Sequence, residues 1–154
     1  LDLCMQTKWA YGNAWAPCII EKKINGEYKY FFYYSGDDGK RKSIGVAIAD
    51  NPTGPFVDFG KPIINKLPAG QKHGQQIDVD VFHDPDTGFD YLYWGNGYMA
   101  GARLNPDMTS IDESTTVLMT PKGGSLKDYA YREAPYVFKR NGIYYFHWSV
   151  DDTG

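Results

Sequence analysis

Short apolar segments with a period of two follow one another along the whole chain. No stretch of useful length repeats at the 3.6-residue period of an amphipathic helix. The alternation therefore predicts an all-β protein. The expected strands are residues 17–24, 28–35, 43–49, 56–64, 78–83, 91–94, 100–104, 116–119, 134–139 and 143–149.

Turn signals separate these strands at regular places. Asn25-Gly26 and Asn141-Gly142 predict tight hairpin turns, because both residues of such turns need a positive φ. The segment DPDTG at residues 84–88 predicts a longer turn at the equivalent place, and turn chemistry accounts for its aspartates better than a calcium loop does. Three hairpins therefore repeat along the sequence.

The three hairpins share one plan: a special polar or aromatic residue, an apolar strand, a turn and a tyrosine-rich strand. Trp15, Asp78 and Glu133 lead the three repeats. Two further strands follow the first hairpin around the turn at residues 51–54, which makes four strands in each unit. A repeat of small antiparallel sheets predicts a β-propeller built of four-stranded blades.

The blades of this propeller are expected at about residues 15–64 and 78–120, with half a blade at 133–154. A propeller closes its ring with four to eight blades, so that no long sheet edge stays exposed. Two and a half blades cannot close a ring. The sequence therefore predicts a fragment, completed by the missing part of the propeller or by self-association.

Composition narrows the classes of partner. The 154 residues carry a formal net charge of -3, and their lysines and arginines are scattered, which does not provide the basic face that nucleic acid requires. No run reaches the roughly 18 apolar residues of a membrane span. Neutral or sugar-like ligands fit this composition better.

Cysteine usage and the ends of the chain add little. Cys4 and Cys18 have no metal or redox spacing, and we interpret both as free packing residues. No metal and no cofactor is predicted. The start lacks the features of a signal peptide, and both ends resemble cuts through a fold. The compartment stays open, with a secreted or periplasmic location favoured.

The leading residues suggest a chemistry. The first strand of each propeller blade lines the central axis, so Trp15, Asp78 and Glu133 are expected to converge on one mouth of the channel. Sugars suit such a pocket, because their C–H faces stack on Trp while carboxylates accept hydrogen bonds from their hydroxyls. Glycoside cleavage also needs paired carboxyl groups.

Several ordered motifs at residues 14–17 (AWAP), 44–56 (IGVAIADNPTGPF), 76–82 (QIDVDVF), 91–96 (YLYWGN) and 132–146 (REAPYVFKRNGIYYF) carry a resemblance. The chain resembles the family 43 glycoside hydrolases, which are five-bladed β-propeller β-xylosidases and α-L-arabinofuranosidases. The resemblance implies a partial five-bladed propeller that hydrolyses xylosyl or arabinofuranosyl linkages by single-step inversion.

The resemblance also implies roles for single residues. Glu133 corresponds to the general acid, Asp78 to the carboxylate that orients this acid and tunes its proton affinity, and Trp15 to a sugar-contacting residue. The family needs a further Asp as general base, and no residue here matches it, so this chain alone is expected to be inactive. Departures from the family pattern at Cys18, Val79 and Ala134 leave the substrate undetermined.

Other interpretations of these residues stay open. Glu133 taken alone suits a solvated strand end paired with Arg132 or Lys139. Asp80 competes with Asp78 because it lies two positions along on the same strand face, although the family match favours Asp78. As substrate-binding candidates we take Trp94, which is equally well a core residue, and Asn96, at the expected pocket rim.

His73 is expected in a loop, where a lone histidine is weak evidence for a metal or substrate ligand.

Two other functions compete with the glycosidase. A neighbouring family that acts on fructans reads Glu-Cys-Pro and Arg-Asp-Pro where this chain has Glu-Ala-Pro and Ile-Asp-Val. A propeller that binds carbohydrate without cleaving it is the alternative from a different class.

Overall fold

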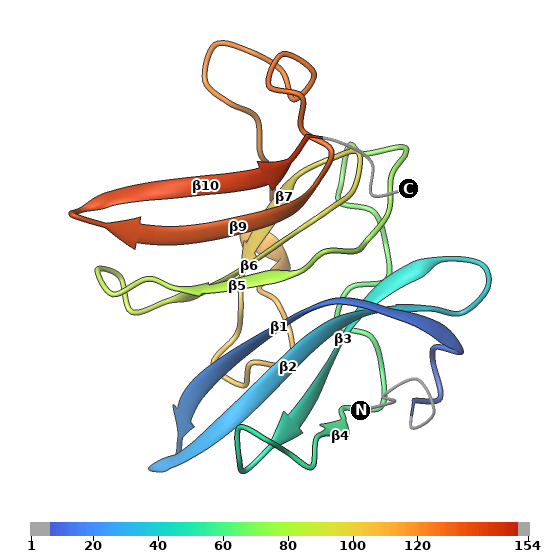
Figure 1. Cartoon of the computed structure of the whole chain (residues 1–154), viewed down its shortest axis with the longest axis vertical. Coiled ribbons are helices and arrows are strands. Elements are labelled where there is room, and N and C mark those ends of the chain that lie inside the picture. Colours follow the sequence, from blue (N-terminus) through green and yellow to red (C-terminus); the bar gives the residue numbers. More distant parts are fainter. Residues whose placement is uncertain (1–6, 151–154) are drawn as a thin grey trace.

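The computed structural model describes residues 7–150. It contains two four-stranded antiparallel sheets and a two-stranded hairpin (Figure 1). The first sheet comprises β1 (Gly12–Ile24), β2 (Glu27–Asp37), β3 (Lys42–Ala49) and β4 (Val57–Asp58). The second comprises β5 (Asp80–His83), β6 (Asp90–Trp94), β7 (Ala100–Arg103) and β8 (Val117–Leu118), and a short 3-10 helix, η2 (Glu113–Thr115), precedes β8. The hairpin consists of β9 (Glu133–Arg140) and β10 (Ile143–Ser149).

The three sheets follow one another along the long axis of the molecule (Figure 1). Their first strands β1, β5 and β9 lie next to each other, and each sheet continues outward in chain order. This is the arrangement of successive propeller blades, so the predicted all-β fold and partial propeller are confirmed. Among residues 7–150, no helix is long and apolar enough to cross a membrane.

The predicted hairpin turns are confirmed. Asn141 and Gly142 both have a positive φ, 52° and 76°, and the Asn-Gly pair between β1 and β2 has the same signs. The longer turn between β5 and β6 is closed by a hydrogen bond from the Asp84 amide to the Phe89 carbonyl (2.9 Å). The Thr87 hydroxyl donates to the Asp84 carboxylate (2.7 Å), so the aspartate serves the turn.

Strand lengths differ from the prediction at several places. The strand expected at 56–64 is regular only at Val57–Asp58. Gly60 has a φ of 95° and Pro62 offers no N–H, so the ladder stops and resumes as a single bridge between Ile44 and Ile64. In contrast, β1 begins at Gly12, five residues before the predicted start, because two bulges let a longer segment stay paired with β2.

The register of the repeat also needs correction. In each blade, the leading residue lies opposite a residue near the end of the second strand. The pairs are Trp15 with Ser35, Ile77 with Gly95, and Glu133 with Ser149. Ile77, and not Asp78, therefore corresponds to Trp15 and Glu133.

Asp78 corresponds instead to the residue after the leader in the other blades. Ala16, Asp78 and Ala134 have φ values of 41°, 60° and 57°, so all three lie in the left-handed region. Such a residue interrupts the alternation of side chains and bends the strand. Hydrophobic alternation alone does not reveal an inserted residue, which explains the error of one position.

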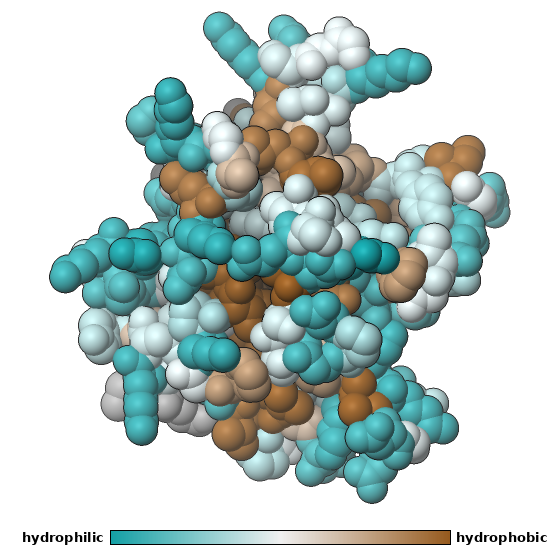
Figure 2. Space-filling view, turned by 180° about the vertical axis from the view of Figure 1, so that it is seen from behind, coloured by the Kyte–Doolittle hydropathy of each residue, from teal (hydrophilic) through white to brown (hydrophobic). Residues whose placement is uncertain are grey.

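The main core lies between the first two sheets. Its buried members include Phe31, Tyr33, Ile44, Val46, Leu92, Trp94, Ala100 and Ala102. Between the two sheets, the buried Tyr33 hydroxyl donates a hydrogen bond to the Met108 carbonyl (2.7 Å). Lys22 forms an ion pair with the buried Asp90 (2.5 Å). Seen from behind, apolar side chains also reach the surface in several separate patches between hydrophilic ones (Figure 2).

Candidate active site

Asp78 is fixed from both sides. Its carboxylate Oδ2 accepts a hydrogen bond from the backbone N–H of Ala134 (3.1 Å), the residue after Glu133. Its own N–H donates to the hydroxyl of Ser35 (3.2 Å), a fully buried residue in the last part of β2. Asp78 therefore links three successive blades at the point where their first strands begin.

The electrostatics of Asp78 follow from this position. Partial burial, and after it the negative charge of Glu133, raise the pKa of Asp78 to about 6, and the hydrogen bond from Ala134 offsets only part of this shift. Two carboxyl groups that repel each other disfavour the doubly ionised state, so such a pair retains a proton more readily than isolated carboxyls do.

Glu133 begins β9 and is half-buried. Its Oε2 accepts a hydrogen bond from Nδ2 of Asn96. The backbone beside it is held by the same loop of the preceding blade, because the N–H of Gly97 donates to the Arg132 carbonyl (3.0 Å) and the Tyr131 hydroxyl donates to the carbonyl that precedes Asn96 (2.7 Å). The loop 95–97 therefore fixes both the side chain and the backbone approach of Glu133.

Trp15 offers aromatic surface at the start of the first blade. It is 45% exposed and lies opposite Ser35, the residue that holds Asp78. The ammonium group of Lys42 lies 4.1 Å from the centre of the Trp15 ring and also pairs with Asp37 (2.5 Å). This cation–π contact fixes the ring while part of it stays accessible.

An open groove of about 590 Å³ lies near this site, although Trp15, Asp78, Asn96 and Glu133 do not line it. It is lined by the loop after β2 and by two stretches of the long connection that leads to β5. Lys42, which covers Trp15, belongs to its lining, as does Gln75, whose backbone exchanges two 3.0 Å hydrogen bonds with Asn96. The groove therefore borders one residue that contacts Trp15 and one that contacts Asn96, and its lining is mostly polar.

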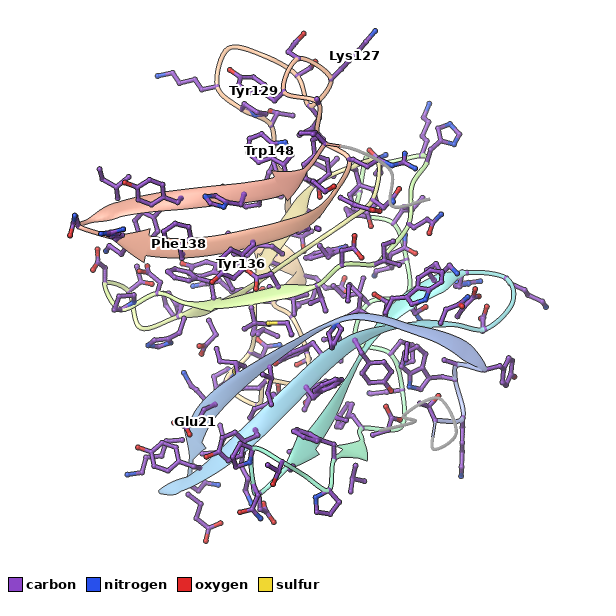
Figure 3. All side chains as sticks on the ribbon, in the orientation of Figure 1. Glu21, Lys127, Tyr129, Tyr136, Phe138 and Trp148 are labelled. Carbon is purple, nitrogen blue, oxygen red and sulfur yellow. The ribbon has the colours of Figure 1, made fainter. Side chains whose placement is uncertain are left out.

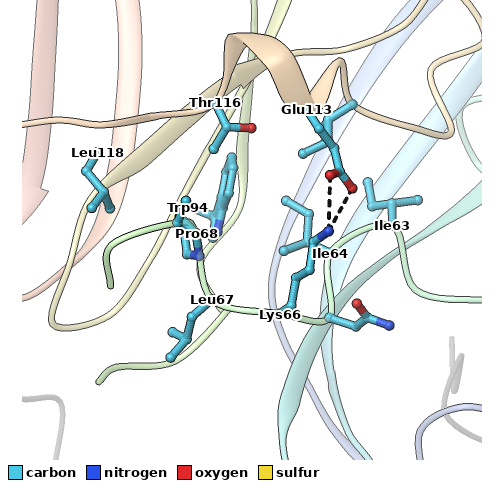
Figure 4. A pocket seen from close by; sticks show the side chains of 12 residues that line it. Ile63, Ile64, Lys66, Leu67, Pro68, Trp94, Glu113, Thr116 and Leu118 are labelled. Atoms are coloured by element: carbon cyan, nitrogen blue, oxygen red, sulfur yellow. Dashed lines mark hydrogen bonds and ion pairs between the residues drawn. The ribbon is translucent and has the colours of Figure 1, made fainter. Parts of the chain in front are cut away.

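Trp94 lies in the main core and not in the candidate site. It is 1% exposed and belongs to the main core, so its ring has no accessible face on which a sugar could stack. Trp94 also bounds a cavity of about 280 Å³, where Figure 4 shows it near Pro68, with the ion pair of Lys66 and Glu113 (3.0 Å) close by. Neither Asp78 nor Glu133 lines this cavity, so the core interpretation of Trp94 holds in this structure.

Asp80 has a structural position. It is 6% exposed, accepts a hydrogen bond from the N–H of Val137 (2.8 Å) and contacts the thiol of Cys18 (3.5 Å). It thus joins β1, β5 and β9 beneath the candidate site, and Cys18 is a free thiol as predicted. Cys4 lies outside the described residues. His73 lies in an exposed loop, also as predicted.

Sequence reasoning missed one residue and one contact of this site. Ser35 was counted only as a strand end, and Asn96 was expected at the pocket rim without its contact to Glu133. A signal existed, because Ser35 lies near the end of the aromatic strand β2 and Asn96 follows the aromatic strand β6, at the mouth where the leading residues gather. Within residues 7–150, no group of three or more His, Cys, Asp or Glu side chains could hold a metal ion.

The chain resembles several known proteins along most of its length. The chain is 33% identical to an arabinoxylan arabinofuranohydrolase of Bacillus subtilis over 96% of its own length and 30% of the relative. It is 34% identical to a beta-D-galactofuranosidase of Aspergillus niger over 92% of its length and 40% of the relative. Across the curated relatives it matches, the chain spans between 24% and 53% of their length.

Solved structures show the same fold. The crystal structure of a family 43 arabinoxylan arabinofuranohydrolase from Bacillus subtilis, in complex with cellotetraose, superposes with a TM-score of 0.72 at 33% identity, covering 96% of this chain and 31% of that one. A family 43 beta-xylosidase/alpha-arabinofuranosidase from a compost metagenome, in complex with xylotriose, gives 0.78 at 26% identity, covering 97% and 53%. The family model for glycosyl hydrolases family 43 matches residues 2–154, and the chain belongs to this family.

Proposed function

We propose that this chain carries the acid side of an inverting glycosidase site that acts on xylosyl or arabinofuranosyl linkages. One observation carries the proposal: the carboxyl groups of Glu133 and Asp78 lie at the start of adjacent blades, and each accepts a hydrogen bond from a neighbouring blade. Family membership favours this function over the fructan-acting alternative.

In the proposed reaction, Glu133 donates its proton to the glycosidic oxygen while the bond from this oxygen to the anomeric carbon breaks. A water attacks the opposite face of the sugar and gives a proton to a general base. Burial, and after it the charge of Glu133, raise the pKa of Asp78, and the contact of its carboxylate with the N–H of Ala134 fixes the start of β9.

The general base of the proposal is not a residue of this sequence. In inverting enzymes the two carboxyl groups stand about 6.5–9.5 Å apart, which leaves room for the attacking water. We expect the base to enter when the ring is completed, either by the missing part of a propeller or by self-association. The chain by itself is accordingly expected to bind sugar without turning it over.

The substrate class rests on the relatives and on the surface beside the carboxyl pair. The relatives are described as acting on arabinoxylan or as xylosidases and arabinosidases. Trp15 supplies aromatic surface for a pentose, and the polar groove next to it suits the hydroxyl groups of neighbouring sugar units.

The test compares leaving groups. In the complete ring, Glu133→Gln should lower kcat by about 10² to 10⁴-fold for aryl xylosides or arabinofuranosides with poor leaving groups, the range that a positioned acid contributes. For nitrophenyl glycosides kcat should fall far less, because nitrophenolate leaves without being protonated. Glu21→Gln, on β1 away from the carboxyl pair, is the matched control and should change neither rate.

Equal loss with both classes of substrate would overturn the acid role of Glu133. If the complete ring binds xylotriose but hydrolyses none of these substrates, the carbohydrate-binding alternative would be favoured instead.

A further inference from the structure

We propose that Asn96 is a positioning residue: its side-chain amide holds one oxygen of Glu133, so that the other oxygen presents the transferable proton to the substrate. The inference rests on the proposed acid role of Glu133. It gives Asn96 a role that differs from the expected binding of substrate, because the side-chain amide of Asn96 donates to Glu133.

The backbone of Asn96 is locked before its side chain acts. Its N–H and its carbonyl both pair with Gln75, each at 3.0 Å, which makes an isolated β-bridge between two loops. Gly95, just before it, has a φ of 129°, and a Cβ there would lie 2.2 Å from the carbonyl oxygen of Tyr98. Only glycine fits this close approach, and it lets the loop turn Asn96 toward the next blade.

The hydrogen bond from Asn96 to Glu133 separates the two oxygens of the carboxyl group. Nδ2 of Asn96 is a donor, so Oε2 of Glu133 must act as an acceptor. In the protonated acid, the proton then lies on Oε1. An amide does not titrate in the working pH range, so the contact persists both before and after the proton has left. The geometry of the acid is thus kept through the reaction cycle.

The loop 95–97 is built around this contact. The N–H of Gly97 bonds to the carbonyl of Arg132 (3.0 Å), immediately before Glu133. The hydroxyl of Tyr131 bonds to the carbonyl of Gly95 (2.7 Å). Three hydrogen bonds from three consecutive residues therefore reach three consecutive residues of the next blade, and the only one made by a side chain of the loop ends on Glu133.

The test separates positioning from sugar binding. In the complete ring, Asn96→Ala should lower kcat for poor leaving groups roughly tenfold to a hundredfold, within the contribution of a positioned acid. KM should stay unchanged, and nitrophenyl substrates should be nearly unaffected. Asn105→Ala removes a comparable amide that donates to Ser110 (2.9 Å) in another loop, and it should alter none of these values.

A rise in KM with both classes of leaving group would mean that Asn96 binds sugar, and would overturn the proposal. A uniform fall of kcat with both classes would mean that the loop is only structural, with the same consequence.

A spectroscopic measurement keeps this inference distinct from the proposed function, because it needs no turnover. In the ¹⁵N-labelled 154-residue chain, one Nδ2 proton of Asn96 should resonate downfield as a donor to a carboxylate. Glu133→Gln should move it upfield, whereas Glu21→Gln should not. If the chemical shift of this Asn96 proton is the same in Glu133→Gln, the proposed contact is wrong, even if the enzyme is an active glycosidase.

Discussion

The environment of Asp78 destabilises the folded chain when this residue is ionised. Its pKa is raised to about 6, mainly by burial and then by the charge of Glu133, above the usual value of 3.8. The folded state therefore binds its proton more tightly than the unfolded state. Stability from this group is greatest below pH 3.8 and falls as the pH rises toward and through 6.

Asp78→Asn should accordingly stabilise the chain more at pH 7.5 than at pH 4.5, because the amide cannot ionise and still accepts a hydrogen bond from Ala134. Urea unfolding at the two pH values measures the difference. Asp112→Asn is the control: hydrogen bonds, that of Ser114 first, lower the pKa of Asp112, so its contribution is already complete at pH 4.5. A gain for Asp78→Asn that is equal at both pH values would contradict the assignment.

Cys18 gives a second prediction at this scale. Burial, more than its contact with Asp80, raises the pKa of the Cys18 thiol to about 12. A thiol reacts as its thiolate, so iodoacetamide at pH 8 should label Cys18 at least roughly a hundredfold more slowly in the folded chain than in urea. Mass spectrometry of the peptides separates Cys18 from Cys4. Labelling at equal rates in both states would contradict the burial of this thiol.

Glu133 and Asp78 could be proposed as a pair because both stand in motifs that resemble the family, although the repeat position assigned to Asp78 was wrong by one residue. The partners of these residues could not. The hydrogen bonds from Asp78 to Ser35 and from Asn96 to Glu133 cross between blades over long stretches of sequence, and no local pattern encodes such contacts. Trp94 shows the converse limit, since a Trp beside the site and a Trp in the core look alike in sequence.

At the scale of elements, the hairpin between β9 and β10 depends on its turn. Gly142 has a φ of 76°, a conformation that costs a residue with a Cβ about 1 kcal/mol or more. Gly142→Ala should therefore lower the free energy of unfolding by about 1 kcal/mol, as measured by urea titration. Gly12→Ala, at a strand position with open space around it, should be close to neutral. Equal effects would argue against a strained turn.

The positions of strands could be predicted where hydrophobic and polar residues alternate regularly. The prediction failed where the backbone is irregular. The hairpins came out correctly because Asn-Gly turns fix their register. The first strand was predicted too short and the fourth too long, since bulges extend β1 while Gly60 and Pro62 interrupt the segment after β4. An error of one residue at Asp78 arose from the same cause.

At the scale of the molecule, the hairpin exposes one side, the open aromatic face of Tyr136, Phe138, Ile143, Tyr145 and His147. Figure 3 shows Tyr136 and Phe138 on β9. The rings of Phe138 and Tyr145 stack at 5.0 Å, and Tyr136 is 55% exposed. The opposite side of the hairpin packs on the second sheet, for example through Phe146 against Tyr93 (5.5 Å). In a closed ring, a further blade would cover the open aromatic face.

The chain should therefore associate as its concentration rises. Tyr136→Lys combined with Tyr145→Lys should weaken this association at least roughly tenfold, because charges on the open aromatic face oppose its burial. Sedimentation velocity over a range of concentrations measures the effect. Tyr11→Lys alters a residue that is 79% exposed outside this face and should leave association unchanged. A chain that stays monomeric throughout would contradict the prediction.

The left-handed position shared by Ala16, Asp78 and Ala134 has a consequence for redesign. Glycine would relax the backbone at all three, so a search for stability alone would select it at each. In two blades the exchange would remove only a methyl group. At Asp78 it would delete the carboxylate beside Glu133, the proposed acid. Selection for stability alone would therefore remove from Asp78 the carboxylate on which the proposed function depends.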